Sequence, residues 1–223
     1  MSELHSAKLV HITPDAEKLI AYMARVSSQN QTNPKIARLL RFCLKQGHVS
    51  IFEMASMAVE ITTTRAIETQ ILRHRSLSYQ SLSQRYSRPD SAGEPLPSLL
   101  QSAMQTDWRL QDTKNRQNSI EPSDEQQTEF AQFTTRFANL AKDAQDLYDD
   151  MLDAGIAKEC ARGVLPINQP TRLYMHGTIR SWIHYLQVRI KPDVQKEHRQ
   201  IANDILAIFA SQLPIIFEAA FTN

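Results

Sequence analysis

The segment from Thr69 to Pro89 concentrates side chains that bind anions. It has no acidic residue, it holds five serines, and its basic residues are Arg73, His74, Arg75, Arg85 and Arg88. Guanidinium groups grip phosphate through paired hydrogen bonds, and serine hydroxyls add short neutral donors. Tyr79 and Tyr86 offer flat faces on which a base can stack. The segment therefore predicts a site for an anionic ligand, with a solvated basic loop or a dock for an acidic partner chain as alternatives.

The overall composition makes that anion site a local feature. The formal net charge of the 223 residues is only +1, so no general field draws the chain to nucleic acid or to a membrane. There are five glycines, and neither GxGxxG nor GxxxxGK[ST] occurs. A phosphate must therefore be held by side chains, chiefly Arg and Ser, because no glycine-rich turn is present to cradle it.

The remaining composition is ordinary for a soluble globular protein. No apolar run approaches the ~20 residues of a spanning helix, and the N-terminus has no apolar signal core. The expected location is the cytoplasm, or a host cytoplasm for a viral gene. Cys43 and Cys160 lie far apart without a CxxC pair, which predicts two buried free thiols and no metal site.

Periodicity predicts an α+β fold, with one domain over residues 1–223 and a mostly antiparallel central sheet flanked by helices. Strands are expected at 7–12, 54–61 and 171–175. Helices are expected at 14–26, 34–45, 62–74, 157–163, 178–189 and 192–213, the last with Pro192 near its first turn. Residues 75–122 lack a sustained period, which indicates a functional loop followed by a surface insertion at about 90–122.

A long helix near 124–154 follows that insertion. Ser123 and Gln126 form a capping box at its start, and Gly155 stands where a helix ends. Its apolar stripe is suited either to core packing or to an interface between chains. The stripe consists of Phe130, Phe133, Phe137, Leu140, Ala144, Leu147 and Met151.

The helix at 62–74 positions part of the anion site. Gln70, Arg73 and His74 occupy positions i, i+3 and i+4, which share one helix face. The amide of Gln70 both donates and accepts hydrogen bonds, which suits the imide edge of a uracil.

These residues carry a specific resemblance. Arg73-His74-Arg75, seven residues and then Ser83 is similar to the RHRX7S signature of flavin-dependent thymidylate synthases. The runs at 48–53 (HVSIFE), 70–73 (QILR) and 83–87 (SQRYS) resemble other elements of that family, as do 159–166 and 178–189. These elements follow the family's order over most of the chain.

The resemblance implies a reductive methylation of dUMP to dTMP. It implies 5,10-methylenetetrahydrofolate as carbon donor, FADH2 as hydride source and NADPH to reduce the flavin again, without an enzymic cysteine nucleophile. It also implies a homotetramer with active sites shared between chains. The alternative is a nucleotide- or RNA-binding module that uses the Arg/Ser/Tyr loop at 73–88, although a net charge of +1 is low for such a module.

The resemblance also implies roles for individual residues. The expected flavin-binding residues are His48, Ser50, Glu53, Arg73, His74, Arg75, Ser81, Thr178, Ile179, Arg180 and His184. The expected dUMP-binding residues are Gln70, Arg73, Ser81, Leu82, Ser83, Gln84, Arg85, Arg162 and Arg189. Arg189 is the expected catalytic residue, because a permanently charged donor stabilises negative charge that grows on the uracil ring.

Overall fold

The computed structural model describes residues 4–87 and 95–222 and confirms the predicted α+β fold. The strands are β1 (Ser6–Ile12), β2 (Ser56–Thr64), β3 (Ser78–Ser81), β4 (Leu110–Gln111), β5 (Ser119–Ile120) and β6 (Pro170–Thr178). The α-helices are α1 (Ala16–Ala24), α2 (Ala37–Lys45), α3 (Arg65–Ile71), α4 (Leu99–Met104), α5 (Asp124–Asp153), α6 (Lys158–Ala161), α7 (Ile179–Arg189), α8 (Lys196–Gln212) and α9 (Pro214–Phe221). Two 3-10 helices are η1 (Val49–Glu53) and η2 (Arg162–Val164).

The central sheet has the strand order β1-β2-β6-β3, and each neighbouring pair is antiparallel. β2 and β6 pair along their whole length, from Ser56 opposite Thr178 to Thr64 opposite Pro170. Burial alternates along β6, where Leu173 and Met175 are buried while Tyr174 is exposed. This period of two gives the sheet one buried face and one exposed face.

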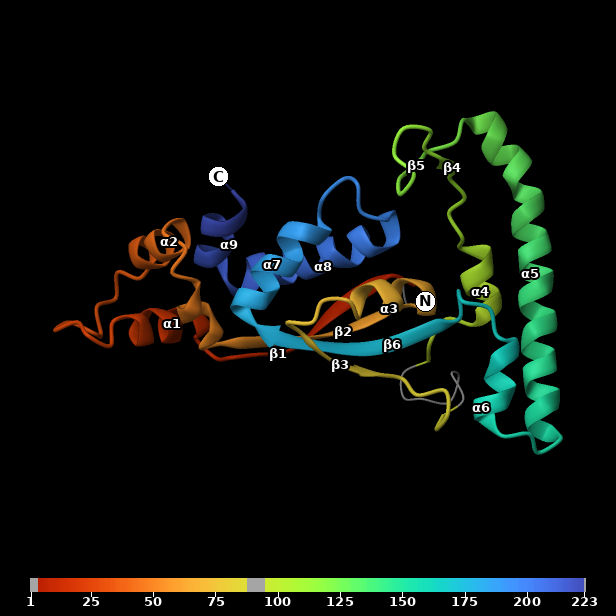
Figure 1. The fold of residues 1–223 in the computed structure, drawn as a ribbon, viewed down its shortest axis with the longest axis horizontal. Helices are drawn as coiled ribbons and strands as arrows, with labels where there is room; N and C mark the ends of the chain where they lie inside the picture. Colours follow the sequence, from red (N-terminus) through yellow and green to blue (C-terminus); the bar gives the residue numbers. More distant parts are fainter. Residues whose placement is uncertain (1–3, 88–94, 223) are drawn as a thin grey trace.

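Helices α3, α7 and α8 lie along one face of this sheet (Figure 1). The fully buried Trp182 of α7 lies in the core between them, and its indole N–H donates a 2.9 Å hydrogen bond to the Met57 carbonyl of β2. Gly177, near the end of β6, allows the Leu77 side chain to pack directly against the strand backbone. A Cβ at this position would stand 2.3 Å from that side chain. This packing fixes α7 against the turn that follows α3.

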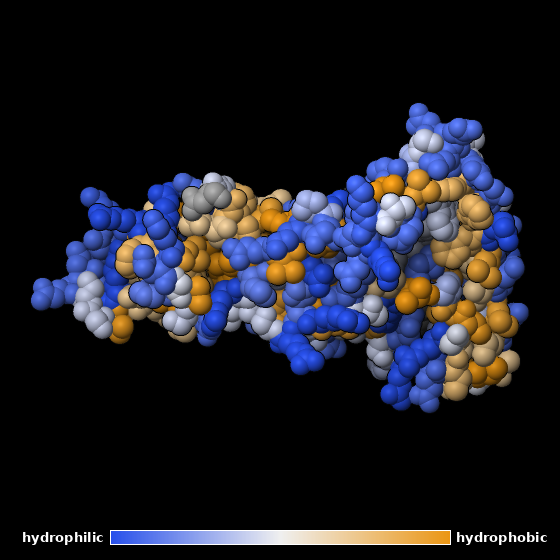
Figure 2. Space-filling view, turned by 45° about the horizontal axis from the view of Figure 1, so that its top comes forward, coloured by the Kyte–Doolittle hydropathy of each residue, from blue (hydrophilic) through white to orange (hydrophobic). Residues whose placement is uncertain are grey.

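The long helix α5 stands at one end of the molecule (Figure 1). It begins with the predicted capping box, in which Ser123 accepts from the Gln126 backbone and the Gln126 side chain accepts from the Ser123 backbone. Gly155 follows its end with a φ of +82°, as the prediction of its C-terminal position requires. Its apolar stripe is only partly covered, since Phe133, Leu140 and Leu147 remain exposed. Figure 2 shows apolar surface gathered at this end of the molecule.

Two sequence predictions around Thr62–Thr64 were wrong. The strand predicted to end at residue 61 continues to Thr64, because these β-branched residues pair with β6 in the sheet. The following helix starts at Arg65 and ends at Ile71 rather than near residue 74. Arg73 and His74 therefore lie in the turn beyond the helix and not on its face.

The region expected to be irregular contains regular structure. β3 adds an edge strand next to β6, although residues 78–81 were predicted as loop. α4 carries its own capping box, Ser98 with Gln101, and buries Leu99 and Ala103 against α5. Residues 95–122 are therefore partly packed into the protein, while 90–94 lie outside the described residues.

Two further predictions need correction. The last predicted helix starts at Lys196, so Pro192 lies in the preceding turn, and it is followed by α9 with Pro214 in its first turn. Cys43 is buried as predicted, but Cys160 is exposed on α6. Within residues 4–87 and 95–222, no helix is long and apolar enough to cross a membrane.

Candidate active site

Two distant parts of the chain meet at a hydrogen bond between Arg189 and His74. Arg189 is the last residue of α7, and its Nε donates to Nε2 of His74 over 2.6 Å. Nε2 can accept only when the imidazole is neutral with its proton on Nδ1. Burial, together with the charges of Arg189 and His184, lowers the pKa of His74 to about 4. At neutral pH the His74 ring is therefore an acceptor that orients the guanidinium group.

A buried aromatic cluster supports the His74 ring. The ring stands edge to face against Tyr185, with 4.8 Å between the centroids. The Tyr185 hydroxyl lies 3.1 Å from Nε2 of His198, and both residues are fully buried. Burial, with the charges of Arg189 and His74, lowers the pKa of His198 to about 3 and keeps that ring neutral. The cluster thus places two neutral histidines near one permanent cation.

The turn that carries His74 is held by a tyrosine from β3. The Tyr79 hydroxyl lies 2.9 Å from the carbonyl oxygen of Ile71 and 2.9 Å from that of His74. The Ile71 carbonyl, at the end of α3, also accepts from the His74 backbone N–H, and the His74 carbonyl also accepts from that of Leu77. Burial raises the pKa of Tyr79 to about 12, so its hydroxyl stays protonated and can donate. Tyr79 therefore fixes the backbone on which His74 stands.

A cleft of about 510 Å³ opens between η1 and α7. Glu53, Arg180 and His184 line it, and all three were predicted to bind flavin. Arg180 forms an ion pair with Glu53 across the cleft. Ser76 and Gln187 also line the cleft and were not predicted. The cleft combines the paired charges of Arg180 and Glu53 with hydrogen-bonding side chains, so an anionic, ring-bearing ligand would bind Arg180 in place of Glu53.

Two predicted flavin residues at the start of α7 already have internal partners. The Thr178 hydroxyl accepts from the Ser181 backbone N–H at 3.3 Å and caps the helix. The Ile179 side chain is buried, and its N–H donates to the Ala55 carbonyl at 3.0 Å. Both residues set the position of α7, and Arg180 is the next side chain along this helix that reaches the cleft.

A second polar cluster lies next to α6. Arg85 forms an ion pair with Glu159 over 2.8 Å, and Lys158 donates to the Tyr86 carbonyl at 3.0 Å. Arg85 and Lys158 line a shallow cleft of about 430 Å³ beside the end of α5. Arg162 is exposed on η2, directly after α6. Two cationic side chains thus line this cleft, of which Arg85 is paired with a carboxylate, and Arg162 follows α6 directly in the chain.

The other predicted site residues lie on segments that border the cleft between η1 and α7 or the polar cluster next to α6. Gln70 lies in the last turn of α3 and donates to the Gln195 side chain at 2.6 Å. Leu82 donates its backbone N–H to the Arg172 carbonyl at 2.9 Å, which continues the pairing of β3. Exposed side chains on these segments are those of His48, Ser50, Arg73, Arg75 and Ser83, while Ser81 and Gln84 are half-buried. Arg88 lies outside the described residues.

One chain therefore brings together some predicted residues and separates others. Arg189 and His74 touch, and Glu53, Arg180 and His184 share a cleft. Arg85 and Arg162 lie with α6 near the α5 end instead (Figure 1). Tyr185 and His198 were not assigned to the site, and Tyr79 was predicted to stack on a base, whereas its hydroxyl instead holds the turn that carries His74.

Comparisons with known proteins place these features in a family. Residues 8–215 match the family model described as thymidylate synthase complementing protein. The flavin-dependent thymidylate synthase of Synechocystis is 49% identical over 91% of this chain and 88% of its own length. The probable flavin-dependent thymidylate synthase of Paramecium bursaria Chlorella virus 1 is 43% identical over 96% of this chain and 98% of its own. A solved UMP/dUMP methylase from Streptomyces cacaoi, bound with 5-Br dUMP, superposes with a TM-score of 0.77 at 25% identity, covering 96% of this chain and 93% of that one.

Proposed function

The chain belongs to the family of flavin-dependent thymidylate synthases, and we propose that it converts dUMP to dTMP by reductive methylation. It is a methyltransferase of that family. The hydrogen bond between Arg189 and His74 is the observation that supports the proposal most directly. It joins the Arg-His-Arg segment to the late helix at one point and leaves the terminal nitrogens of Arg189 available to a ligand. Family membership favours this enzyme over the nucleotide- or RNA-binding module.

The proposed cofactor is FAD, with NADPH and 5,10-methylenetetrahydrofolate as co-substrates. The residues of the cleft fit part of a flavin dinucleotide, since the guanidinium group of Arg180 can turn from Glu53 to a diphosphate while His184 and Ser76 offer further hydrogen bonds. Arg73, His74 and Arg75 would hold the flavin from the turn after α3. When bound, the reduced flavin supplies the hydride that turns the transferred one-carbon group into a methyl group.

The proposed task of Arg189 is electrostatic. Its Nε is occupied by His74, so its two terminal nitrogens can face the O2 edge of the uracil ring as a fork, while N3–H, itself a donor, is left to an acceptor. A fixed positive charge at that edge stabilises the negative charge that develops as C5 becomes nucleophilic. The neutral His74 adds orientation without a second positive charge.

The phosphate of dUMP would be held by the cluster next to α6. Arg85 and Arg162 supply guanidinium groups, and Ser83 adds a hydroxyl. Ser81, Leu82 and Gln84 would line the path between this cluster and the base.

The proposal needs no cysteine nucleophile. Cys43 is a buried residue of α2, and burial raises the pKa of its thiol, which disfavours the thiolate. Cys160 is exposed on α6, which packs against the end of α5 and not against α7 (Figure 1). Neither thiol lies beside Arg189.

The proposed assembly is a homotetramer with shared active sites. The phosphate-binding residues lie with α6, whereas Arg189 and His74 lie at the end of α7 (Figure 1). A second chain that docks its α6 region against the first chain's cleft would complete one site. The exposed Phe133, Leu140 and Leu147 of α5 supply apolar surface for such contacts.

The purified protein provides the first test. It is expected to be yellow, to bleach when NADPH is added without oxygen, and to form dTMP from dUMP only with methylenetetrahydrofolate present. Absorbance spectra and product mass follow these steps. A protein that stays colourless after incubation with FAD would contradict the proposal.

A further inference from the structure

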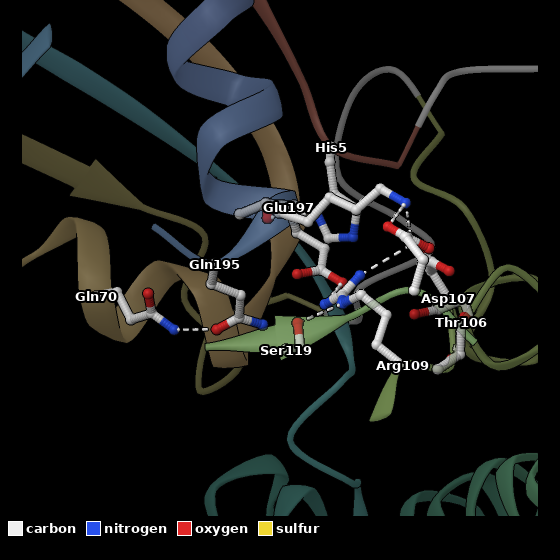
Figure 3. Close-up of polar contacts among 12 residues, drawn as sticks. His5, Gln70, Thr106, Asp107, Arg109, Ser119, Gln195 and Glu197 are labelled. Carbon is white, nitrogen blue, oxygen red and sulfur yellow. Dashed lines mark hydrogen bonds and ion pairs between the residues drawn. The ribbon is translucent and has the colours of Figure 1, made fainter. Parts of the chain in front are cut away.

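Gln195 occupies the position that precedes helix α8, yet its side chain does not cap that helix. Short side chains such as Ser, Thr, Asp and Asn are preferred there, because they reach the free N–H groups of the first turn. The Gln195 side-chain oxygen instead accepts a 2.6 Å hydrogen bond from the side-chain nitrogen of Gln70 on α3 (Figure 3). The amide of Gln195 is thus committed to another glutamine.

The two residues after Gln195 are anchored to the β4–β5 region. Lys196 forms ion pairs with Asp107 at 2.7 Å and with Glu121 at 2.9 Å. Glu197 pairs with Arg109 at 2.7 Å, and the side chain of Arg109 is only 10% exposed. Several charges in one network restrain a backbone better than an isolated surface pair does.

Arg109 connects this network of charges to the paired strands β4 and β5. It also donates to the Ser119 hydroxyl at 2.9 Å and pairs with Asp107 at 2.9 Å (Figure 3). The start of α8 is therefore held by residues before β4 and by residues within and after β5. The segment that contains these two strands fixes the position of the Gln195 backbone.

The bond between the two glutamines sets the orientation of Gln70. A side-chain amide has two N–H donors at one end and a carbonyl acceptor at the other. Because Gln195 presents its oxygen, Gln70 turns its nitrogen toward Gln195, and no residue within 4–87 and 95–222 donates a hydrogen bond to the side-chain oxygen of Gln70. A free acceptor matches the N3–H of uracil, whereas N3 of cytosine carries no proton and would face that oxygen lone pair to lone pair.

We propose that Gln195 is a specificity-determining positioning residue, which selects uracil over cytosine by fixing the amide of Gln70. This inference rests on the proposed function, in which Gln70 faces the base. Gln195 itself does not contact the ring.

The test compares dUMP and dCMP binding to the flavin-loaded enzyme. Gln195→Met keeps the length of the side chain but removes the acceptor, and Gln195→Glu keeps an acceptor oxygen. Gln212→Met, at the exposed far end of the same helix, is the matched control. Dissociation constants come from titration calorimetry, and flavin absorbance reports the fold of each variant.

For Gln195→Met we expect roughly three- to tenfold weaker dUMP binding, the range of one lost hydrogen bond. The preference for dUMP over dCMP should fall by a similar factor, while Gln195→Glu and Gln212→Met keep the wild-type preference. A Gln195→Met enzyme with unchanged preference would overturn the inference, and so would an equal loss in Gln212→Met.

The wild-type enzyme separates this inference from the proposed function. If the wild type binds dUMP and forms dTMP, and Gln195→Met prefers dUMP over dCMP as strongly as the wild type does, only the inferred role of Gln195 is contradicted. A wild type that binds neither nucleotide contradicts the proposed function, and the inference with it.

Discussion

Nε of Arg189 and Nε2 of His74 lie 2.6 Å apart, although 115 positions separate the two residues in the sequence. The contact constrains both partners. Arg189 loses the freedom of its long side chain, and His74 must keep one tautomer. The guanidinium group is thereby oriented before any ligand arrives, which is the condition for electrostatic catalysis without reorganisation.

The acceptor role of His74 can be tested with two substitutions. His74→Phe keeps a ring against Tyr185 and removes the acceptor, whereas His74→Gln restores an oxygen at a similar reach. We expect turnover to fall roughly 10- to 100-fold in His74→Phe, the range of a lost hydrogen bond to a charged group. His74→Gln should recover part of that loss. Steady-state kinetics with saturating cofactors measure both, and equal losses in the two variants would argue that the acceptor is irrelevant.

Stability should decrease on the acid side of neutrality. In the unfolded chain, His74 and His198 return to their ordinary pKa of 6.5 and take up protons as the pH falls. The folded protein resists this uptake until about pH 4 for His74 and about pH 3 for His198, because burial disfavours the charged rings. The unfolded state therefore binds more protons between pH 6.5 and 4, and the free energy of unfolding falls over that window.

Urea denaturation at pH 7 and pH 5 measures this loss. His198→Gln should flatten the pH dependence, since it removes one of the two groups, while His11→Gln on the exposed strand β1 serves as control. An identical pH slope in wild type and His198→Gln would show that His198 does not carry the effect.

The buried pair of Tyr185 and His198 should couple in stability. Tyr185→Phe leaves Nε2 of His198 without its partner in the core, which should cost about 1–3 kcal/mol of unfolding free energy. The double variant with His198→Leu should lose less than the sum of the single losses, because both polar groups are then gone. Additive losses in thermal or urea denaturation would mean that the 3.1 Å contact contributes little.

Arg85 should act on substrate binding rather than on the chemical step. If it holds the phosphate of dUMP, Arg85→Ala raises KM for dUMP roughly tenfold or more and changes kcat much less, as expected for contacts equally strong in ground and transition states. Glu159→Gln, which frees Arg85 from its ion pair, should lower KM. A fall in kcat at unchanged KM in Arg85→Ala would assign Arg85 another task.

Local patterns predicted those elements whose signals lie within a few residues of one another. The capping box at Ser123 and the glycine after α5 mark a helix whose ends the structure confirms. The threonines at 62–64 were misread, because their side chains suit a helix start but their backbone pairs with β6, more than a hundred residues away. The capping box at Ser98 was overlooked in a segment interrupted by prolines.

The site was predictable as a list of residues but not as an arrangement. The spacing of Arg73, His74 and Arg75 indicates an anion site, yet a spacing cannot say which ring nitrogen faces Arg189. The support from Tyr79, Tyr185 and His198 depends on the packing of α7 and α8 over the sheet, which only tertiary structure determines. The separation of Arg85 from Arg189 likewise has no signal in the sequence.

The central claim is that Arg189 activates the uracil ring, and tritium release from 5-tritiated dUMP tests it most directly. The measurement compares wild type, Arg189→Lys and Arg189→Ala, each with its flavin content read from the absorbance spectrum. Arg189→Ala is expected to retain flavin and to release tritium at least ~100-fold more slowly, since it loses a charged donor aimed at the ring. Arg189→Lys should fall between the two, because it keeps the charge but not the fork. Wild-type tritium release by a flavin-loaded Arg189→Ala enzyme would contradict the claim.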